Sequence, residues 1–220
     1  MIYEFFFLTY ALIWYSGKYY NINMYYIHEY LSLALSLIVY FSHDIPFIYD
    51  NKYLFSDTQP YEHINKLIIC IIIYLFLDLF FNKLIKIDII LHHFGGIIAY
   101  SLAILGNNVG VVNNCVKFEI SNIWLCLYKI SKNSNNIIIK NIYFISVFLF
   151  LFTYIIYRII PSTIMFIEVL RNLDILTQNI YSSIHIVLYI IHISLQYFWF
   201  IMILKKFFSI IKENFSNKIK

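Results

Sequence analysis

Long apolar runs, separated by short polar segments, dominate the hydrophobic pattern of the chain. A helix needs about 20 mostly apolar residues to cross a bilayer, and roughly 17 to 25 are tolerated. The pattern predicts an all-α integral membrane protein, built as a bundle of six to seven transmembrane helices. The candidate spans cover residues 4–16, 25–42, 67–82, 88–105, 110–128, 141–167 and 180–204.

The first run is shorter than the others, and it predicts a signal anchor or an interfacial helix. No basic segment precedes it and no clear small-residue cleavage site follows it, which argues against a removed signal peptide. The chain has only five Gly and three Pro, so no segment resembles a flexible linker. We expect an N-terminal membrane helix and short loop (1–24), one membrane domain (25–206) and a basic cytosolic tail (207–220).

Basic residues fall unevenly between the two sides of this arrangement. The rule that Lys and Arg accumulate in cytosolic loops then predicts a non-cytosolic N-terminus and a cytosolic C-terminus. The predicted cytosolic side receives Lys18, Lys83, Lys86, Lys129, Lys132, Lys140, Lys205, Lys206, Lys212, Lys218 and Lys220. The other side receives only Lys52, Lys66 and Arg171.

Composition agrees with a membrane protein, since 61% of the residues are hydrophobic and 13% are charged. An ordinary soluble domain has about twice that charged fraction. The formal charge is +4, but the lysines are scattered in short loops and at the C-terminus, which favours a membrane surface over nucleic acid as partner. The longest predicted loop, 43–66, is acidic, and we expect His43 and His63 to be solvated there.

Three cysteines, Cys70, Cys115 and Cys126, lie in apolar segments without CxxC or zinc-type spacing. We expect buried free thiols, no metal site and no bound cofactor.

Charged and imidazole side chains interrupt the predicted spans at a small set of positions. A charged group near the bilayer centre is costly, so such residues normally face a bundle interior or a polar cavity and are candidates for function. The set comprises the cations Lys117 and Arg158, the acids Glu29, Asp78, Asp88 and Glu119, and the imidazoles His28, His92, His93, His185 and His192.

The fourth predicted span places an acid beside a histidine pair. Asp88 and His92 stand four residues apart and share a helix face, which Gly96 and Ala99 continue. A carboxylate at that spacing can fix the tautomer of the imidazole. His93 lies about 100° further round the helix. We therefore expect one histidine to face a cavity while the other packs against a neighbouring helix.

Three further spans carry polar residues at helical spacing, which predicts a polar interior lined from at least four helices. In the sixth span Tyr154 and Arg158 share a face just before Pro161, where a kink would free backbone carbonyls. The fifth span carries Cys115, Glu119, Asn122 and Cys126, and the last carries Ser182, His185, Tyr189, His192, Gln196 and Trp199.

Several of these residues also have a purely structural interpretation. Polar groups in membrane bundles often tie helices together by hydrogen bonds. His28 and Glu29 begin the second span, where we expect an interfacial role. The structural interpretation is the one we favour for His185, His192, Gln196 and Asn122.

The two cations keep alternatives of their own. Lys117 can snorkel, or it can pair with Asp78 or Glu119. Arg158 can form an ion pair with Glu119, or it can bind the phosphate of a lipid or nucleotide. A functional role is favoured for the cluster of Asp88, His92, His93 and Glu119.

Five segments in this order give the chain a resemblance to a known membrane family, the TLC-domain proteins, which include the ceramide synthases. The resemblance covers roughly residues 25 to 206. Its segments are "YLFLDLFF", "DIILHHFGGIIAY", "KFEISNIWL", "YIIYRIIPSTIMF" and "LQYFWFIMILKKF".

The resemblance implies a helical barrel open to the cytosolic side, usually in the endoplasmic reticulum, with the His pair inside it. Ceramide synthases follow that pair with two aspartates in the next helix, whereas Glu119 and Asn122 stand here. This difference resembles the non-ceramide-synthase branch, which is tied to membrane lipid composition. The matching positions are Asp78, Asp88, His92, His93, Glu119, Ser121, Arg158 and Trp199.

Two functional hypotheses follow from the residues and the resemblance together. The first is a role in membrane lipid homeostasis, by binding, sensing or remodelling lipids. The alternative is an acyltransferase of ceramide-synthase type, in which acyl-CoA is the co-substrate, His92 or His93 is base or nucleophile, and Ser121, Asn122 or Arg158 stabilises the oxyanion. A transporter or receptor is a further alternative, and a homo-oligomer is compatible with each of them. A di-iron enzyme lacks its histidine boxes here, and a retinal protein lacks its lysine.

Overall fold

The computed structural model describes residues 8–9, 11–13, 15–16, 24–42, 62–81, 87–106, 115–132, 137–178 and 180–218. Every secondary-structure element in these ranges is helical, which confirms the all-α prediction for this part of the chain. The elements are α2 (Met24–Ser42), α3 (Glu62–Phe81), α4 (Ile87–Gly106), η2 (Lys117–Ser121), α6 (Asn122–Ser131), α7 (Ile137–Tyr154), η3 (Ile155–Ile159), α8 (Ile160–Arg171), α9 (Leu173–Leu176) and α10 (Ile180–Lys218).

The helix bounds follow the predicted apolar runs, with two differences. The predicted loop 43–66 is too long, because α3 already begins at Glu62 and the first turn of a helix accommodates polar residues. His63 thus belongs to α3, whereas His43 lies outside the described residues. The described residues of the run 4–16 are helical, and the remainder of that run lies outside them.

The second difference concerns the C-terminal segment, which was predicted to leave the membrane domain at residue 206. Helix α10 instead continues without interruption to Lys218. Ile210 is 6% exposed, so the first turns beyond residue 206 still pack against the rest of the molecule. The boundary of the predicted tail therefore falls inside a continuous helix.

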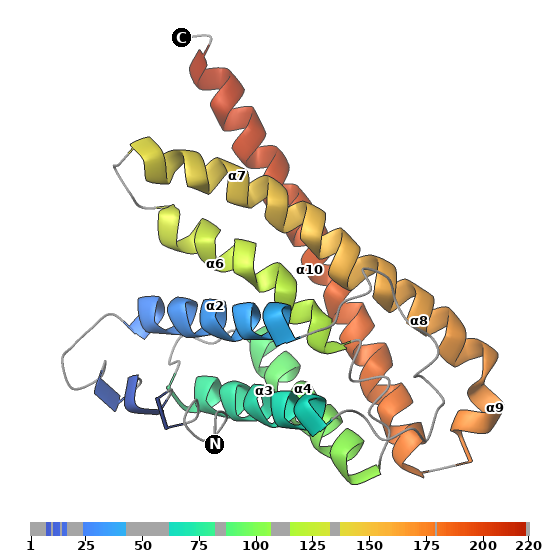
Figure 1. Ribbon diagram of the computed structural model, residues 1–220. Helices are drawn as coiled ribbons and strands as arrows, with labels where there is room; N and C mark the ends of the chain where they lie inside the picture. Colours follow the sequence, from blue (N-terminus) through green and yellow to red (C-terminus); the bar gives the residue numbers. More distant parts are fainter. Residues whose placement is uncertain are drawn as a thin grey trace.

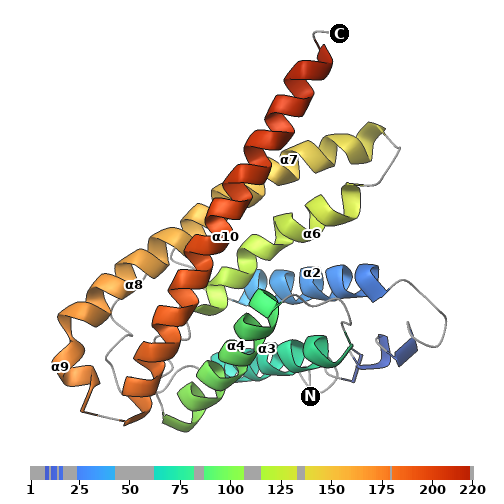
Figure 2. The same ribbon diagram turned by 180° about the vertical axis from the view of Figure 1, so that it is seen from behind.

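Neighbouring helices contact one another in a closed ring. Figures 1 and 2 show α10 crossing the molecule from the α9 end to the C-terminus, alongside α7 and α8 on one side and α4 on the other. The C-terminal end of α6, the start of α7 and the C-terminal end of α10 lie toward one end of the molecule, and α9 lies at the other (Figure 1). The contacts run from α2 to α3, α4, α10, α7 and α6, and back to α2.

The main apolar core lies between α2 and α3 and reaches the segment around η2. Leu35, Val39, Leu67, Ile68 and Ile71 are each at most 1% exposed. This packing fixes α2 and α3 against each other, and so positions the polar residues that the same two helices carry.

Two stretches of the described chain are long and apolar enough to cross a membrane, Asn141–Arg171 and Ser183–Lys212. Only 28% and 17% of their most apolar windows are buried within the molecule. Shorter apolar helices cover Ile27–Phe41 and Ile87–Leu102. The two long helices thus present most of their apolar side chains outward, unlike the buried core helix of a soluble protein.

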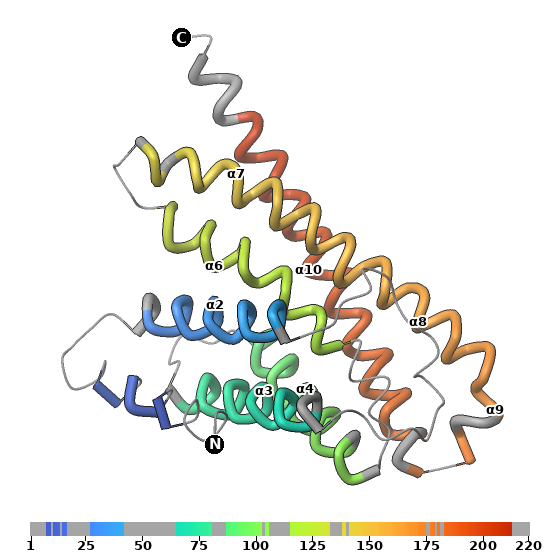
Figure 3. The backbone as a smooth tube through the Cα atoms, in the orientation of Figure 1, coloured from blue at the N-terminus to red at the C-terminus, as the bar shows by residue number. Residues whose placement is uncertain are grey.

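A π-helical turn, η3, joins α7 to α8 just before Pro161. Pro161 has no N–H to donate to the carbonyl of residue 157, and the preceding N–H of Ile160 donates to the Ile155 oxygen, five residues back. The backbone runs on from α7 into α8 (Figure 3), so a π turn occupies the place where a kink was predicted. Arg158 lies within this turn.

Candidate functional site

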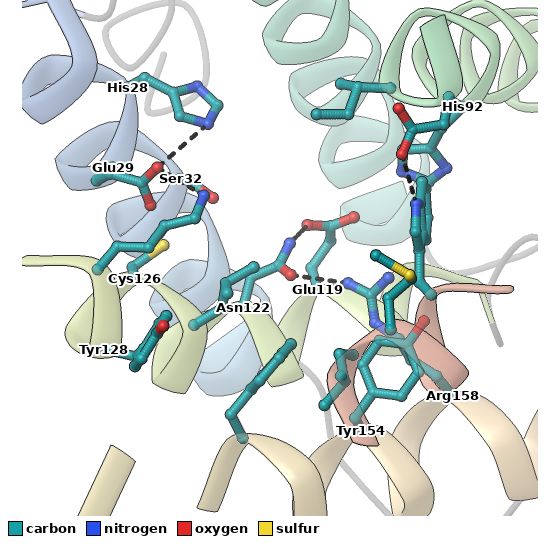
Figure 4. Close-up of a pocket in the computed structure, with 18 of the residues that line it drawn as sticks. His28, Glu29, Ser32, His92, Glu119, Asn122, Cys126, Tyr128, Tyr154 and Arg158 are labelled. Carbon is teal, nitrogen blue, oxygen red and sulfur yellow. Dashed lines mark hydrogen bonds and ion pairs between the residues drawn. The ribbon is translucent and has the colours of Figure 1, made fainter. Parts of the chain in front are cut away.

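A cavity of about 460 Å³ lies inside the ring of helices. This volume is within the range of about 300 to 1,000 Å³ that is usual for small-molecule sites. Figure 4 shows side chains from several helices converging on it. Its charged and polar lining includes His28, Glu29, Asp78, Asp88, His92, His93, Glu119, Asn122, Lys129, Arg158 and Trp199.

Asp78 of α3 joins two histidines from neighbouring helices. Its carboxylate oxygens lie 2.6 Å from Nδ1 of His28 on α2 and 2.7 Å from Nε2 of His93 on α4. Asp78 is fully buried, so the two imidazoles replace the water that its carboxylate would otherwise bind. The contact favours the tautomer of His93 that is protonated at Nε2, and Nδ1 of the same ring is buried without a hydrogen-bond partner in the described part of the chain.

His92 has a different environment, although it is the next residue. Its ring meets the Trp199 ring edge-on, with centroids 5.0 Å apart, and lies 5.7 Å from the ring of His192. Its Nδ1 is buried and has no hydrogen-bond partner among the residues that the structure describes. Asp88 does not fix its tautomer as expected, because Asp88 Oδ2 accepts a hydrogen bond of 2.8 Å from Trp199 Nε1 on α10.

Arg158 occupies a cradle of protein acceptors. Its Nε donates to the Phe118 carbonyl (3.1 Å) and to Ser121 Oγ (2.7 Å), and its Nη2 donates to Asn122 Oδ1 (2.8 Å). Asn122 Nδ2 donates in turn to Glu119 Oε2 at 2.6 Å, so the amide links the guanidinium to the carboxylate (Figure 4). No direct Arg158–Glu119 ion pair forms among the described residues, because the Asn122 amide lies between the two side chains.

Ser121 lies behind Arg158 and is fully buried. Its hydroxyl donates to the Phe118 carbonyl at 2.9 Å while its oxygen accepts from Arg158. The hydroxyl hydrogen is already engaged, so Ser121 positions Arg158 and does not present a donor to the cavity.

Glu29 forms an ion pair that the sequence analysis did not anticipate. It is 1% exposed and accepts from Lys129 Nζ at 2.7 Å, between α2 and α6. His28 and Glu29 both line the cavity, and the interfacial role expected for them stays a prediction. An adjacent histidine and acid inside an apolar run was the available signal for their place in the site.

The remaining predicted residues lie on the inner face of α10. Gln196 is fully buried and its Oε1 accepts from Tyr154 (2.8 Å) and from Arg158 (3.3 Å). His185 lies 3.0 Å from the Ala99 carbonyl, and His192 lies 3.1 Å from Gln196 Nε2. The bonds of His185 and Gln196 cross between helices and match the helix-tying role favoured for them, whereas the His192–Gln196 contact lies within α10. The side chain of Ser182 is outside the described set.

The three cysteines are free, as predicted, with Cys70 and Cys126 buried. Among the described residues, no group of three or more His, Cys, Asp or Glu side chains has the geometry of a metal site. The cavity thus offers imidazoles, carboxylates and a guanidinium, which are groups suited to bind a polar head group or to transfer a proton.

Comparison with protein-family models, with curated proteins and with solved structures finds no match to this chain.

Proposed function

We propose that the protein is a multi-pass membrane protein of TLC type that binds a membrane lipid in the central cavity and acts in membrane lipid homeostasis. The observation that carries this proposal is the contrast between the buried charged side chains around the cavity and the many exposed apolar side chains of the exterior. Soluble domains are arranged the other way round.

The exterior supports a bilayer as the surrounding medium. Along α10, apolar side chains that are about half exposed or more recur on the outward face, at spacings that leave the inward face to polar residues. A soluble monomer rarely exposes so large a continuous apolar surface. Examples are Ile180, Val187, Ile191, Phe198, Ile201 and Phe208.

The cavity supports an amphiphile as the ligand. Its polar residues gather around His92, His93, Asp78 and Arg158, while other parts of its wall are apolar. A lipid can place its head group against the polar residues and a hydrocarbon chain against the apolar wall. The apolar wall includes Leu75, Leu125, Val147, Phe150, Met202 and Ile203.

The functional test is the lipid composition of cells that carry the wild-type protein or the double variant His92→Ala/His93→Ala. We expect the variant to shift the amount of at least one lipid class in the direction that gene deletion does. Ile90→Ala is the matched control, because Ile90 lies on the same helix and does not line this cavity. An unchanged lipidome in the deletion strain and the double variant would reject this function.

The second candidate is an acyltransferase that uses acyl-CoA, and the buried, unbonded Nδ1 atoms of His92 and His93 favour it. One imidazole would take a proton from a sphingoid amine while the amine nitrogen attacks the thioester carbonyl of acyl-CoA. The C–S bond then breaks and the new C–N bond becomes that of the amide. The thiolate of CoA takes the proton from the imidazole and leaves as free CoA. Incubation of purified protein with acyl-CoA and a sphingoid base tests this candidate. Formation of free CoA and an N-acyl product in equal amounts would support it, and the absence of both products would contradict it.

A further inference from the structure

A second, smaller cavity of about 230 Å³ lies between α4 and α10, on the other side of His92. Its lining on α4 includes three residues with small or no side chains, Gly95, Gly96 and Ala99, and its lining on α10 includes the apolar Leu188 and Leu195. An apolar cavity of about 150 Å³ is enough to hold benzene. The space is therefore sufficient for several carbons of a hydrocarbon chain.

Three polar side chains around this second cavity are bonded to protein groups, whereas His92 and Glu119 stand where it meets the first cavity. Tyr189 donates to the Ser162 carbonyl at 2.6 Å, and His185 lies 3.0 Å from the Ala99 carbonyl. His192 stacks on Phe118 and lies 3.1 Å from Gln196 Nε2. With their polar atoms engaged in this way, these residues offer the cavity mainly ring faces, which suit an apolar occupant.

The two cavities share part of their lining. Leu75, His92 and Glu119 line both of them. These three side chains separate the two cavities, so the second cavity begins beside the His pair of the first. This adjacency is the ground for one occupant that reaches from the first cavity past His92 into the second.

Gly95 is the position that keeps the second cavity open. A Cβ atom placed on Gly95 would have no heavy atom within 4 Å, whereas one on Gly96 would come within 2.9 Å of Leu75 Cδ1. A larger side chain at residue 95 can therefore enter the cavity without a clash at its Cβ. The same change at residue 96 would disturb the packing of α4 against α3.

We infer that the second cavity holds the far end of a single hydrocarbon chain whose head group lies in the first cavity, and that Gly95 sets the length of chain accepted. This inference rests on the proposed function. It adds to it a ligand with at least one long chain and a residue that determines chain-length specificity.

Photolabelling with two probes tests the inference directly on the full-length protein in phosphatidylcholine vesicles. Both probes are palmitic acid analogues; one carries a diazirine at the methyl end and the other carries it near the carboxyl group. We expect the methyl-end probe to label Leu188 or Leu195 and the carboxyl-end probe to label residues of the first cavity. Gly95→Phe should reduce the methyl-end labelling about ten-fold, because the added ring takes the place of a few methylene groups of the probe in the second cavity.

Ile98→Phe is the matched control, since it adds the same ring to α4 at a half-exposed position that lines neither cavity. It should change neither labelling pattern. Labelling of the first cavity together with unchanged methyl-end labelling in Gly95→Phe would overturn the inference and leave the proposed function standing. If excess unlabelled palmitate displaced neither probe from the wild type, both would be overturned.

Discussion

Arg158 is held by acceptors from three elements, which makes it the residue with the most connections in the site. The acceptors are the Phe118 carbonyl and Ser121 on η2, Asn122 on α6 and Gln196 on α10. Its guanidinium carbon also lies 5.2 Å from the centroid of the Tyr154 ring, a geometry that stabilises a buried cation. The residue thus ties together helices that are far apart in the sequence.

Replacing Arg158 tests this structural role at the residue scale. Arg158→Met should lower the free energy of unfolding by about 3 kcal/mol or more, because it leaves buried acceptors without their donor. Chemical unfolding in detergent micelles, followed by tryptophan fluorescence, measures the change. Arg171→Met is the control: Arg171 pairs with Glu168 at an exposed position, so its loss should cost about 0.5 kcal/mol or less. Equal losses of unfolding free energy in the two variants would contradict the stabilising role of the acceptors around Arg158.

Asp78 provides a second test, since one carboxylate serves two imidazoles. Asp78→Asn keeps the shape but offers only one acceptor oxygen, so either His28 or His93 loses its partner. We expect a loss of about 1–3 kcal/mol in unfolding free energy. In ¹⁵N spectra of histidine-labelled protein, one of the two imidazoles should lose its preferred tautomer. Spectra unchanged from wild type would show that Asp78 does not determine either tautomer.

Much of this site could be predicted from single residues, because a charge in an apolar run must find a partner. The sequence pointed correctly to Asp78, Glu119, Asn122 and Arg158 as inward-facing residues. Their partners were harder to predict, since a carboxylate can bond either along its own helix or across to another. Asp88 illustrates this: it was expected to hold His92, four residues on, and it bonds Trp199 instead.

At the scale of the elements, the π turn η3 determines where Arg158 points. A π turn inserts one extra residue into a helical turn and so rotates the residues after it relative to those before it. The apolar pattern runs through this region without a break, so periodicity alone could not predict the turn. Pro161 marked the place, but it is compatible with either a kink or a π turn.

Pro161→Ala tests the contribution of this turn. With an N–H restored at residue 161, the carbonyl of residue 157 regains a donor and the segment can return to an α-helix. We expect circular dichroism to show unchanged helix content, and lipid retention through purification to fall several-fold as Arg158 leaves its cradle. Full retention of lipid in the variant would indicate that η3 does not position the site.

At the scale of the whole molecule, the order of helices around the ring was beyond prediction. Apolar faces of different helices look alike in sequence, and only side-chain packing decides which of them meet. The sequence could predict that successive helices end at opposite ends of the molecule, because each predicted span reverses the direction of the chain. In the structure, the C-terminal end of α6, the start of α7 and the C-terminal end of α10 lie toward the same end of the molecule (Figure 1).

Thiol labelling of intact and permeabilised membranes tests the proposed topology. Lys132 and Lys212 are exposed near one end of the molecule, and Asp174 is exposed on α9 at the other. We expect an impermeant maleimide to reach Lys132→Cys and Lys212→Cys from the cytosol, and Asp174→Cys only from the opposite side. The native cysteines are buried or half-buried, which keeps the background low. Labelling of all three positions from one side would contradict a membrane-spanning arrangement.

The central claim is that the cavity around the His pair binds lipid, and native mass spectrometry of protein released from lipid nanodiscs measures this most directly. The wild type should retain a lipid adduct. His92→Ala/His93→Ala should lose most of it, and Ile90→Ala should retain it, with all three proteins equally folded by circular dichroism. Equal adducts on all three proteins, or a wild type without any adduct, would contradict the claim.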